Sequence, residues 1–231
     1  MKKTATLYAL LVSSLAFADG QFEINQLCVA NGCFEGDAPG WPVEITESGS
    51  YRLTSNLDVP PDLIGIEMTG DSVTLDLGGF SVQSDAICSG IPPTCTPSTP
   101  GFGVGILANS EETFIQNGTV RGFNQDCIQG FPDAARLENL IVSSCVGDGI
   151  RLINFGTLDS VSVRFVGNRG AALSSLYWVI DSSFIGAGGF GVSSGICRGN
   201  IFSNNAGSLS VTQENCSITD GSNYCNGAPC P

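Results

Sequence analysis

The sequence predicts an all-β protein in which a short coil of strands repeats along the chain and stacks as a parallel solenoid. Similar residues recur about every 21 positions between Ile115 and Leu209. The repeat is rich in β-branched residues, Gly, Asn and Ser, and it lacks the spacing of an amphipathic helix. Because a period this short accommodates one coil per repeat, we expect successive coils to lie about 4.8 Å apart.

Four apolar positions and one polar position define the repeat. The apolar sets are Ile115, Leu137, Leu158 and Val179; Val120, Val142, Val163 and Phe184; Phe123, Cys145, Val166 and Ala187; and Ile128, Ile150, Ala171 and Val192. The polar set is Asn117, Asn139, Ser160 and Asp181. Tight polar corners are expected between the strands, and each coil buries its apolar side against its neighbours.

The chain divides into four predicted segments. Residues 1–18 are expected to be a signal peptide, because a basic start is followed by a short apolar stretch and by the cleavage pattern Ala16-Phe17-Ala18. Residues 19–40 are expected to form a cysteine-clipped leader or cap, residues 41–211 the β-helix, and residues 212–231 a C-terminal cap. Within the helix, the Pro-rich stretch 83–101 is predicted to be a loop. The mature protein is therefore expected to be secreted, either extracellular or periplasmic.

The charge of the chain restricts its partners. The net charge is −13, the chain has no histidine, and its only lysines are Lys2 and Lys3 in the predicted signal peptide. Such an acidic protein repels phosphate backbones and anionic lipids, so nucleic acid and membrane surfaces are poor partners. Membrane insertion is not expected, because no stretch is long and apolar enough to span a bilayer. The absence of histidine excludes a Ser-His-Asp triad and histidine-ligated metals. We expect a monomer.

Ten cysteines in an exported chain predict disulfides rather than metal ligands. Short spacings predict the pairs Cys28–Cys33, Cys88–Cys95 and Cys225–Cys230. Cys197 and Cys216 are 19 residues apart, about one coil, and are expected to pair across neighbouring coils. Cys127 and Cys145 remain open. They either form a fifth disulfide, or Cys145 is a packed thiol, because it aligns with apolar residues such as Phe123.

Several segments resemble a known fold family. They are PVEI at 42–45, GSYRLTSNL at 49–57, VTLDLGGF at 73–80 and NYCNGAPCP at 223–231. Together with the repeat, they resemble the right-handed parallel β-helix of the pectate-lyase-like fold. More closely, they are similar to exported bacterial β-helix repeat proteins, which mostly lack an assigned function. The resemblance implies the fold but no reaction, because this fold carries lyases, hydrolases, esterases, epimerases and inert surface proteins.

One line of charged residues could support chemistry. Asp126 and Asp148 are 22 residues apart and Arg169 follows 21 residues later, so stacking is expected to bring them together. The two carboxylates could bind calcium. The resemblance implies that Arg169 could then remove a proton next to a uronate carboxyl group, as in β-helix polysaccharide lyases. The alternative is that both aspartates are corner residues that cap local amides.

A second stack consists of Glu138 and Asp159, 21 residues apart, beside Arg136. Two carboxylates at a defined separation could serve as acid and base for glycoside hydrolysis. The simpler interpretation is a solvated edge of the repeat. Asp76 is expected to be structural.

The expected function is that of a secreted, non-catalytic scaffold, associated with a surface or matrix, that binds polysaccharide along one face and requires no cofactor. The first alternative is the calcium-assisted lyase of uronate-containing glycans, and the second is a structural protein whose coils stack end to end. Exposed aromatic residues could stack on sugar rings. The candidates are Trp41, Tyr51, Phe102, Phe123, Phe131, Tyr177, Trp178 and Phe190.

Overall fold

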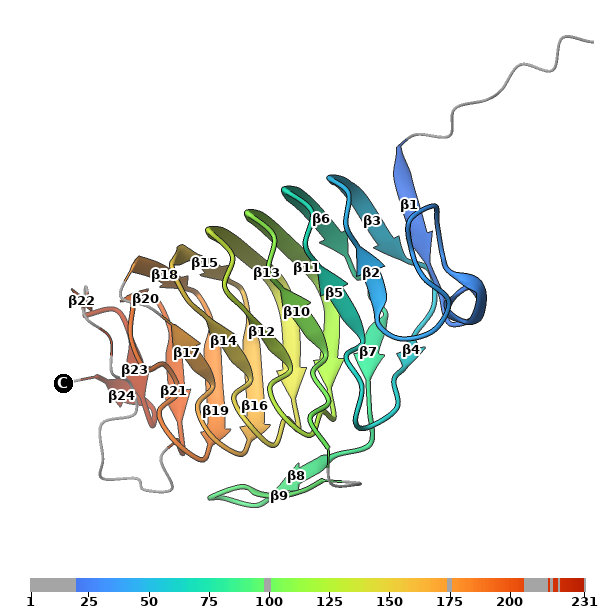
Figure 1. The fold of residues 1–231 in the computed structure, drawn as a ribbon. Coiled ribbons are helices and arrows are strands. Elements are labelled where there is room, and N and C mark those ends of the chain that lie inside the picture. Colours follow the sequence, from blue (N-terminus) through green and yellow to red (C-terminus); the bar gives the residue numbers. More distant parts are fainter. Residues whose placement is uncertain are drawn as a thin grey trace, which may run out of the picture.

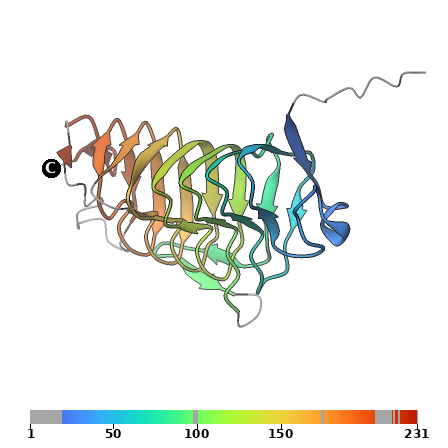
Figure 2. The same cartoon turned by 45° about the horizontal axis from the view of Figure 1, so that its top comes forward.

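Short strands stack into long parallel ladders in a computed structural model of the protein (Figure 1). The structure describes residues 20–97, 101–173, 176–205, 216, 218–219 and 221–230. The predicted signal peptide, the end of the predicted β-helix at 206–211 and parts of the predicted C-terminal cap lie outside these residues. The coils lie side by side in chain order, with β1 at one end and β23 and β24 at the other (Figures 1 and 2). The predicted parallel solenoid is confirmed.

A six-stranded parallel sheet, here sheet B, forms one face of the solenoid. In ladder order its strands are β2 (Val43–Ile45), β5 (Ile66–Met68), β10 (Ile106–Ala108), β12 (Ile128–Gly130), β14 (Ile150–Leu152) and β17 (Ala171–Leu173). Val192 extends it through a bridge to Ala171.

The larger sheet, here sheet A, is bent across its strands, so that it forms two faces of the solenoid, which we call the first and second flanks. The first flank contains β1 (Gln21–Ile24), β3 (Gly49–Leu53), β6 (Ser72–Asp76), the start of β11 (Glu112–Arg121), the start of β13 (Ala134–Ser143), β15 (Phe155–Asp159), β18 (Leu176–Ile180), β20 (Ile196–Arg198) and β22 (Ile218–Thr219). The second flank contains β4 (Leu57–Asp58), β7 (Ser81–Gln83), the ends of β11 and β13, β16 (Ser162–Val166), β19 (Ser183–Ala187), β21 (Ile201–Ser203), β23 (Tyr224–Cys225) and β24 (Ala228–Pro229).

The bend between the flanks lies at the predicted polar corner. Asn117, Asn139, Ser160 and Asp181 have positive φ angles of 59°, 52°, 55° and 47°. Asn and Asp tolerate this left-handed conformation better than most residues, which explains the polar set. The corner side chains also hydrogen-bond along the stack, since Asn139 Nδ2 donates to Asn117 Oδ1 over 3.0 Å.

The predicted alignment of the repeat is the observed strand register. Val120 pairs with Val142, Val142 with Val163, and Val163 with Phe184. Ile128 pairs with Ile150 on sheet B in the same way. These inward residues are fully or almost fully buried, so each coil contributes a layer of the core. Burial of one such side chain stabilises the fold by about 1.5–3 kcal/mol.

Both ends of the described solenoid carry additional structure. At the first end, β1 pairs with β3, and the 3₁₀ turn η1 (Val29–Asn31) follows. The buried Asp37 carboxylate accepts hydrogen bonds from the backbone N–H groups of Cys33 and Glu44. At the other end, β23 and β24 form an antiparallel hairpin. These elements extend the two ends of sheet A beyond the regular coils, and end-to-end stacking stays a prediction.

Five disulfides staple the fold, and four of them are the predicted pairs. Cys127 and Cys145 are bonded, with Cα atoms 5.6 Å apart, which answers the question that the sequence left open. The other bonds are Cys28–Cys33, Cys88–Cys95, Cys197–Cys216 and Cys225–Cys230. Five disulfides indicate an oxidising compartment. Among the described residues, no helix is long and apolar enough to cross a membrane.

The segment predicted as a loop at 83–101 contains a hairpin. It is formed by β8 (Ile87–Ser89) and β9 (Thr94–Thr96), which are clipped together by Cys88–Cys95. The hairpin lies along the solenoid flank, where Cys88 Sγ is 3.5 Å from the carbonyl oxygen of Cys145 (Figure 1). We refer to residues 87–96 as the clipped hairpin.

Candidate functional site

The line of Asp126, Asp148 and Arg169 is brought together at one corner of the solenoid. Each residue lies two positions before a strand of sheet B, namely β12, β14 and β17. Gly147 contributes to this geometry, because a Cβ atom at that position would collide with Asp126 Oδ1. The stacking expected from the sequence therefore places these residues on three successive coils.

Both carboxylates bind the backbone of the next coil. Asp126 Oδ1 accepts a hydrogen bond of 2.7 Å from the N–H of Asp148, and Asp148 Oδ1 accepts one of 2.9 Å from the N–H of Arg169. Arg169 also forms a two-pronged ion pair, in which Nε donates to Asp148 Oδ1 over 3.2 Å and Nη2 to Oδ2 over 3.0 Å. This is the capping role that was the alternative interpretation of the aspartates.

Arg151 is a fourth member of this cluster that the sequence did not predict. Its Nη1 lies 3.6 Å from Asp126 Oδ2, so each buried aspartate has one arginine partner. Arg151 occupies the central, outward position of β14, opposite Gln129 on β12. Because Arg151 stands between the inward residues Ile150 and Leu152, the sequence indicates that its side chain points outward. The repeat pattern does not predict its contact with Asp126.

This geometry does not favour the lyase. Arg169 already donates to Asp148 through two guanidinium nitrogens, and all four carboxylate oxygens of the aspartates face a donor. Within the described residues, no group of three or more His, Cys, Asp or Glu side chains could hold a metal ion. Calcium binding by Asp126 and Asp148 and catalysis by Arg169 stay predictions.

Burial raises the pKa of Asp126, and the neighbouring Asp148 carboxylate raises it further. The hydrogen bond from the Asp148 N–H and the charge of Arg151 lower the pKa, but the net shift is upward. Because the folded pKa lies above the ordinary value of 3.8, the folded state binds more protons between these two values. The contribution of Asp126 to the free energy of unfolding therefore falls as pH rises through this window.

At neutral pH we expect the free energy of unfolding of Asp126→Asn to lie no more than about 1 kcal/mol below that of wild type, or to exceed it. Asn keeps an acceptor for the Asp148 N–H and removes the buried charge. Asp148→Asn is the matched variant and should lose about 1–2 kcal/mol with its Arg169 pair. Urea unfolding at several pH values measures both. A larger loss for Asp126→Asn than for Asp148→Asn would contradict this assignment.

The second predicted stack is also real but lies on the outer surface. Glu138 is in register with Asp159 on the first flank, and Arg136 Nη2 lies 2.7 Å from Glu138 Oε2. The Arg136 guanidinium carbon also lies 5.0 Å from the centre of the Phe114 ring. Asp76, expected to be structural, accepts hydrogen bonds from the Gly78 N–H and from Asn117 Nδ2. Acid–base catalysis by Glu138 and Asp159 stays a prediction.

Only some of the candidate aromatic residues are available to a ligand. Tyr51, Phe123 and Tyr177 are buried, and Trp41 and Phe190 are half-buried. Phe102, Phe131 and Trp178 are exposed. The sequence analysis missed Phe155, which is exposed at the start of β15.

Four exposed apolar residues lie at the corner between sheet B and the first flank or on the adjoining strands of that flank, and we call them the corner patch. They are Phe131, Ile153, Phe155 and Trp178, each between 41% and 55% exposed. They come from three successive coils: Phe131 follows β12, Ile153 follows β14, Phe155 begins β15, and Trp178 belongs to β18.

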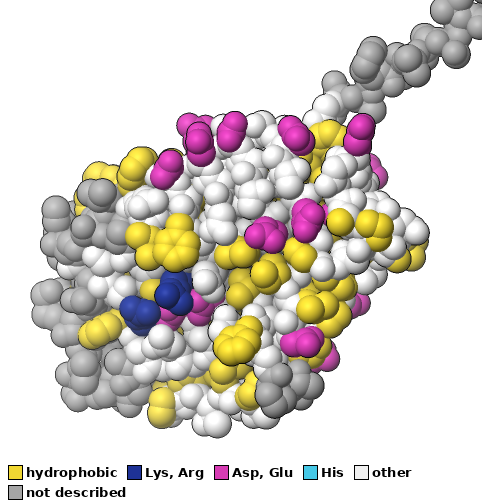
Figure 3. All heavy atoms as spheres, viewed as in Figure 1, with side chains coloured by type: hydrophobic (Ala, Val, Ile, Leu, Met, Phe, Trp, Pro, Cys, Tyr) yellow, Lys and Arg dark blue, Asp and Glu magenta, His cyan; other side chains and the backbone are white. Residues whose placement is uncertain are grey.

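A shallow groove of about 350 Å³ adjoins the corner patch and shares Ile153 with it. Its other lining residues are Arg151, Arg169, Ala172, Leu173 and Ser193. Figure 3 shows that the basic side chains on this face gather at one place, with hydrophobic side chains directly beside them. The corner patch and the groove thus combine flat apolar surface with guanidinium donors.

Comparisons with known proteins provide no further assignment. No protein-family model matches the chain, and neither a curated protein nor a solved structure matches it. A function must therefore be inferred from the chemistry of the surface itself.

Proposed function

We propose that the protein is a secreted, non-catalytic scaffold that binds polysaccharide at the corner patch and the adjoining arginine groove. The observation that carries this proposal is the run of exposed apolar side chains over three successive coils, with two arginines beside it. The five disulfides and the resemblance to exported pectate-lyase-like β-helix proteins support an extracellular surface or matrix location.

The chemistry of the patch suits sugars. Aromatic rings present flat apolar faces on which the C–H faces of pyranose rings can stack. Phe155 and Trp178 lie on neighbouring strands, because Thr157, two residues after Phe155, is paired with Trp178. Such diagonal neighbours are about 7–8 Å apart, within reach of one extended chain.

The two arginines supply directional contacts without a strong local charge. Each retains guanidinium N–H groups that are not used by its aspartate, and these can donate to hydroxyl or carboxylate oxygens of a glycan. The aspartates fix the position of the guanidinium groups from beneath, so little side-chain entropy is lost when a ligand binds. The surface is therefore organised before the polysaccharide arrives.

Trp178→Ala tests this function directly. We expect it to weaken binding to the best ligand among xylan, β-glucan and polygalacturonate by about tenfold, through loss of one stacking contact. Phe102→Ala is the matched control, because Phe102 is exposed and aromatic but lies outside the patch. Isothermal titration calorimetry measures both affinities, with and without a calcium chelator.

Binding that withstands the chelator and weakens in Trp178→Ala but not in Phe102→Ala is the expected pattern. No binding to any of the three polysaccharides, or equal effects of the two variants, would contradict the proposal. Binding that disappears on chelation would instead favour the calcium-assisted alternative.

A further inference from the structure

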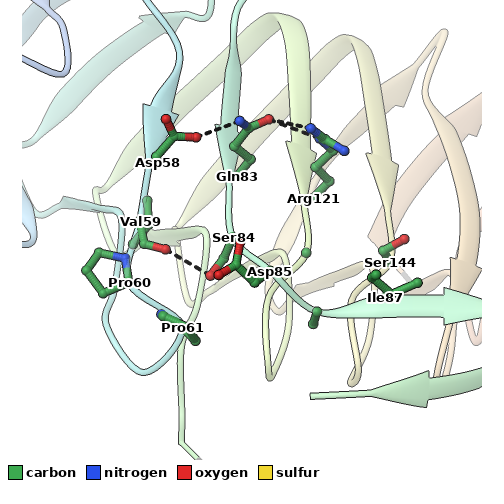
Figure 4. A pocket seen from close by; sticks show the side chains of 12 residues that line it. Asp58, Val59, Pro60, Pro61, Gln83, Ser84, Asp85, Ile87, Arg121 and Ser144 are labelled. Carbon is green, nitrogen blue, oxygen red and sulfur yellow. Dashed lines mark hydrogen bonds between the residues drawn. The ribbon is translucent and has the colours of Figure 1, made fainter. Parts of the chain in front are cut away.

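A second groove, of about 590 Å³, lies on the second flank beside the clipped hairpin, and we call it the hairpin groove (Figure 4). It takes residues from β4, β7 and the end of β11, and from the connections that follow β4 and β7. None of its side chains belongs to the corner patch or the arginine groove.

A fixed row of polar side chains forms one side of the hairpin groove. Asp58, Gln83 and Arg121 are in register on three successive coils. Gln83 Nε2 donates to Asp58 Oδ1 over 2.6 Å, and Gln83 Oε1 accepts from Arg121 Nε over 3.1 Å and from Nη2 over 2.6 Å. Figure 4 shows these three residues joined in one line across the strands. The central amide therefore holds a carboxylate and a guanidinium at fixed positions.

Both ends of this row retain capacity for a ligand. Asp58 and Arg121 are exposed, and the contacts with Gln83 use one carboxylate oxygen and two guanidinium nitrogens. Asp85, also exposed, has no hydrogen bond or ion pair to the described part of the chain. The groove thus offers acceptors and donors within one short span.

The remaining lining supplies an apolar wall. Pro60 and Pro61 follow β4, and Ile87, which is 66% exposed, begins the clipped hairpin. The neighbouring Cys88, held by the Cys88–Cys95 disulfide and by its contact with the Cys145 carbonyl oxygen, keeps Ile87 beside the solenoid. The wall and the polar row therefore border the same cavity.

We propose that the hairpin groove binds a short neutral saccharide. A sugar hydroxyl both donates and accepts, so a hydroxylated ring matches the carboxylate of Asp58 and the guanidinium of Arg121 together. The apolar face of the ring matches Pro60, Pro61 and Ile87. An anionic ligand would meet the carboxylates of Asp58 and Asp85, which outnumber the Arg121 guanidinium, so acidic sugars are disfavoured.

This site is independent of the proposed function, and the experiment separates the two. Neutral hexasaccharides of glucose, xylose, mannose and N-acetylglucosamine are titrated into full-length mature Trp178→Ala protein, in which the corner patch is impaired. A galacturonate hexasaccharide is the charged comparison. We expect saturable binding of at least one neutral hexasaccharide and weaker binding of the charged one.

Three substitutions then locate the site. Gln83→Leu removes the central amide and Arg121→Met removes the donor, and each is expected to weaken binding about tenfold. Arg164→Gln is the matched control, because Arg164 lies on the same outward ladder as Arg121, two coils further on, but does not line the groove. Thermal unfolding of each variant verifies that the fold persists.

Selective loss in Gln83→Leu and Arg121→Met, with Arg164→Gln unchanged, is the predicted result. The proposal is overturned if no neutral hexasaccharide binds, or if both groove variants bind as tightly as their parent. Because Arg121 is exposed, Arg121→Met keeps the test valid even if Gln83→Leu fails to fold.

Discussion

Val142→Asp is expected to abolish stable folding. Val142 is fully buried at the centre of a ladder, where it pairs with Val120 on one side and Val163 on the other. An Asp at this position would place an unpaired charge between two apolar layers, at an expected cost of about 4 kcal/mol or more. That loss is a large part of the 5–15 kcal/mol by which domains are usually stable.

The neighbouring residue provides the control. Ile141 is 51% exposed on the outer face of the same strand, so Ile141→Asp should cost about 1 kcal/mol or less. Urea unfolding followed by circular dichroism compares the two variants. If Val142→Asp unfolds like wild type, or if Ile141→Asp is the more damaging change, the inward register is wrong.

Loss of the Cys127–Cys145 disulfide is the second large expected effect. The bond closes a loop with a sequence separation of 18 residues, and both cysteines are fully buried. In the chain-entropy account, the double variant Cys127→Ala/Cys145→Ala should lose about 3 kcal/mol, with a further loss from the two cavities.

Cys225→Ala/Cys230→Ala is the matched comparison, because its disulfide spans a separation of only 5 residues and both cysteines are less buried. Its loss should be smaller, about 2 kcal/mol. Chemical unfolding under oxidising conditions measures both. Equal or reversed effects would show that the Cys127–Cys145 bond does not brace the core as its burial indicates.

The regular part of the fold could be predicted because side chains in a solenoid repeat with the coil. One aligned position, such as that of Val142, fixes the register of a whole ladder, and the polar corner set follows from the left-handed backbone at residues such as Asn117. Pairing of Cys127 with Cys145 could not be decided, because a disulfide and a buried thiol fit the same inward position.

The remaining features arise where the repeat is interrupted or where contacts cross it. The strand pair β5 and β10 is in register, but the clipped hairpin lies between the two in the chain, so its strands follow no period. β1 was not predicted because its alternation of polar and apolar residues spans only the four residues Gln21–Ile24, too few to stand out in the polar leader. Arg151 reaches Asp126 from β14 on the next coil, and Phe155 joins the corner patch from the start of β15.

The central claim is that the corner patch binds polysaccharide without cleaving it. The most direct measurement incubates the protein with polygalacturonate, xylan and β-glucan. It records binding by calorimetry and new sugar ends, including unsaturated uronate ends, in the same samples. We predict saturable binding that Trp178→Ala weakens, with no new ends at any calcium concentration. Release of new ends that stops in Asp148→Ala would contradict this account and establish an enzyme at the aspartate–arginine line.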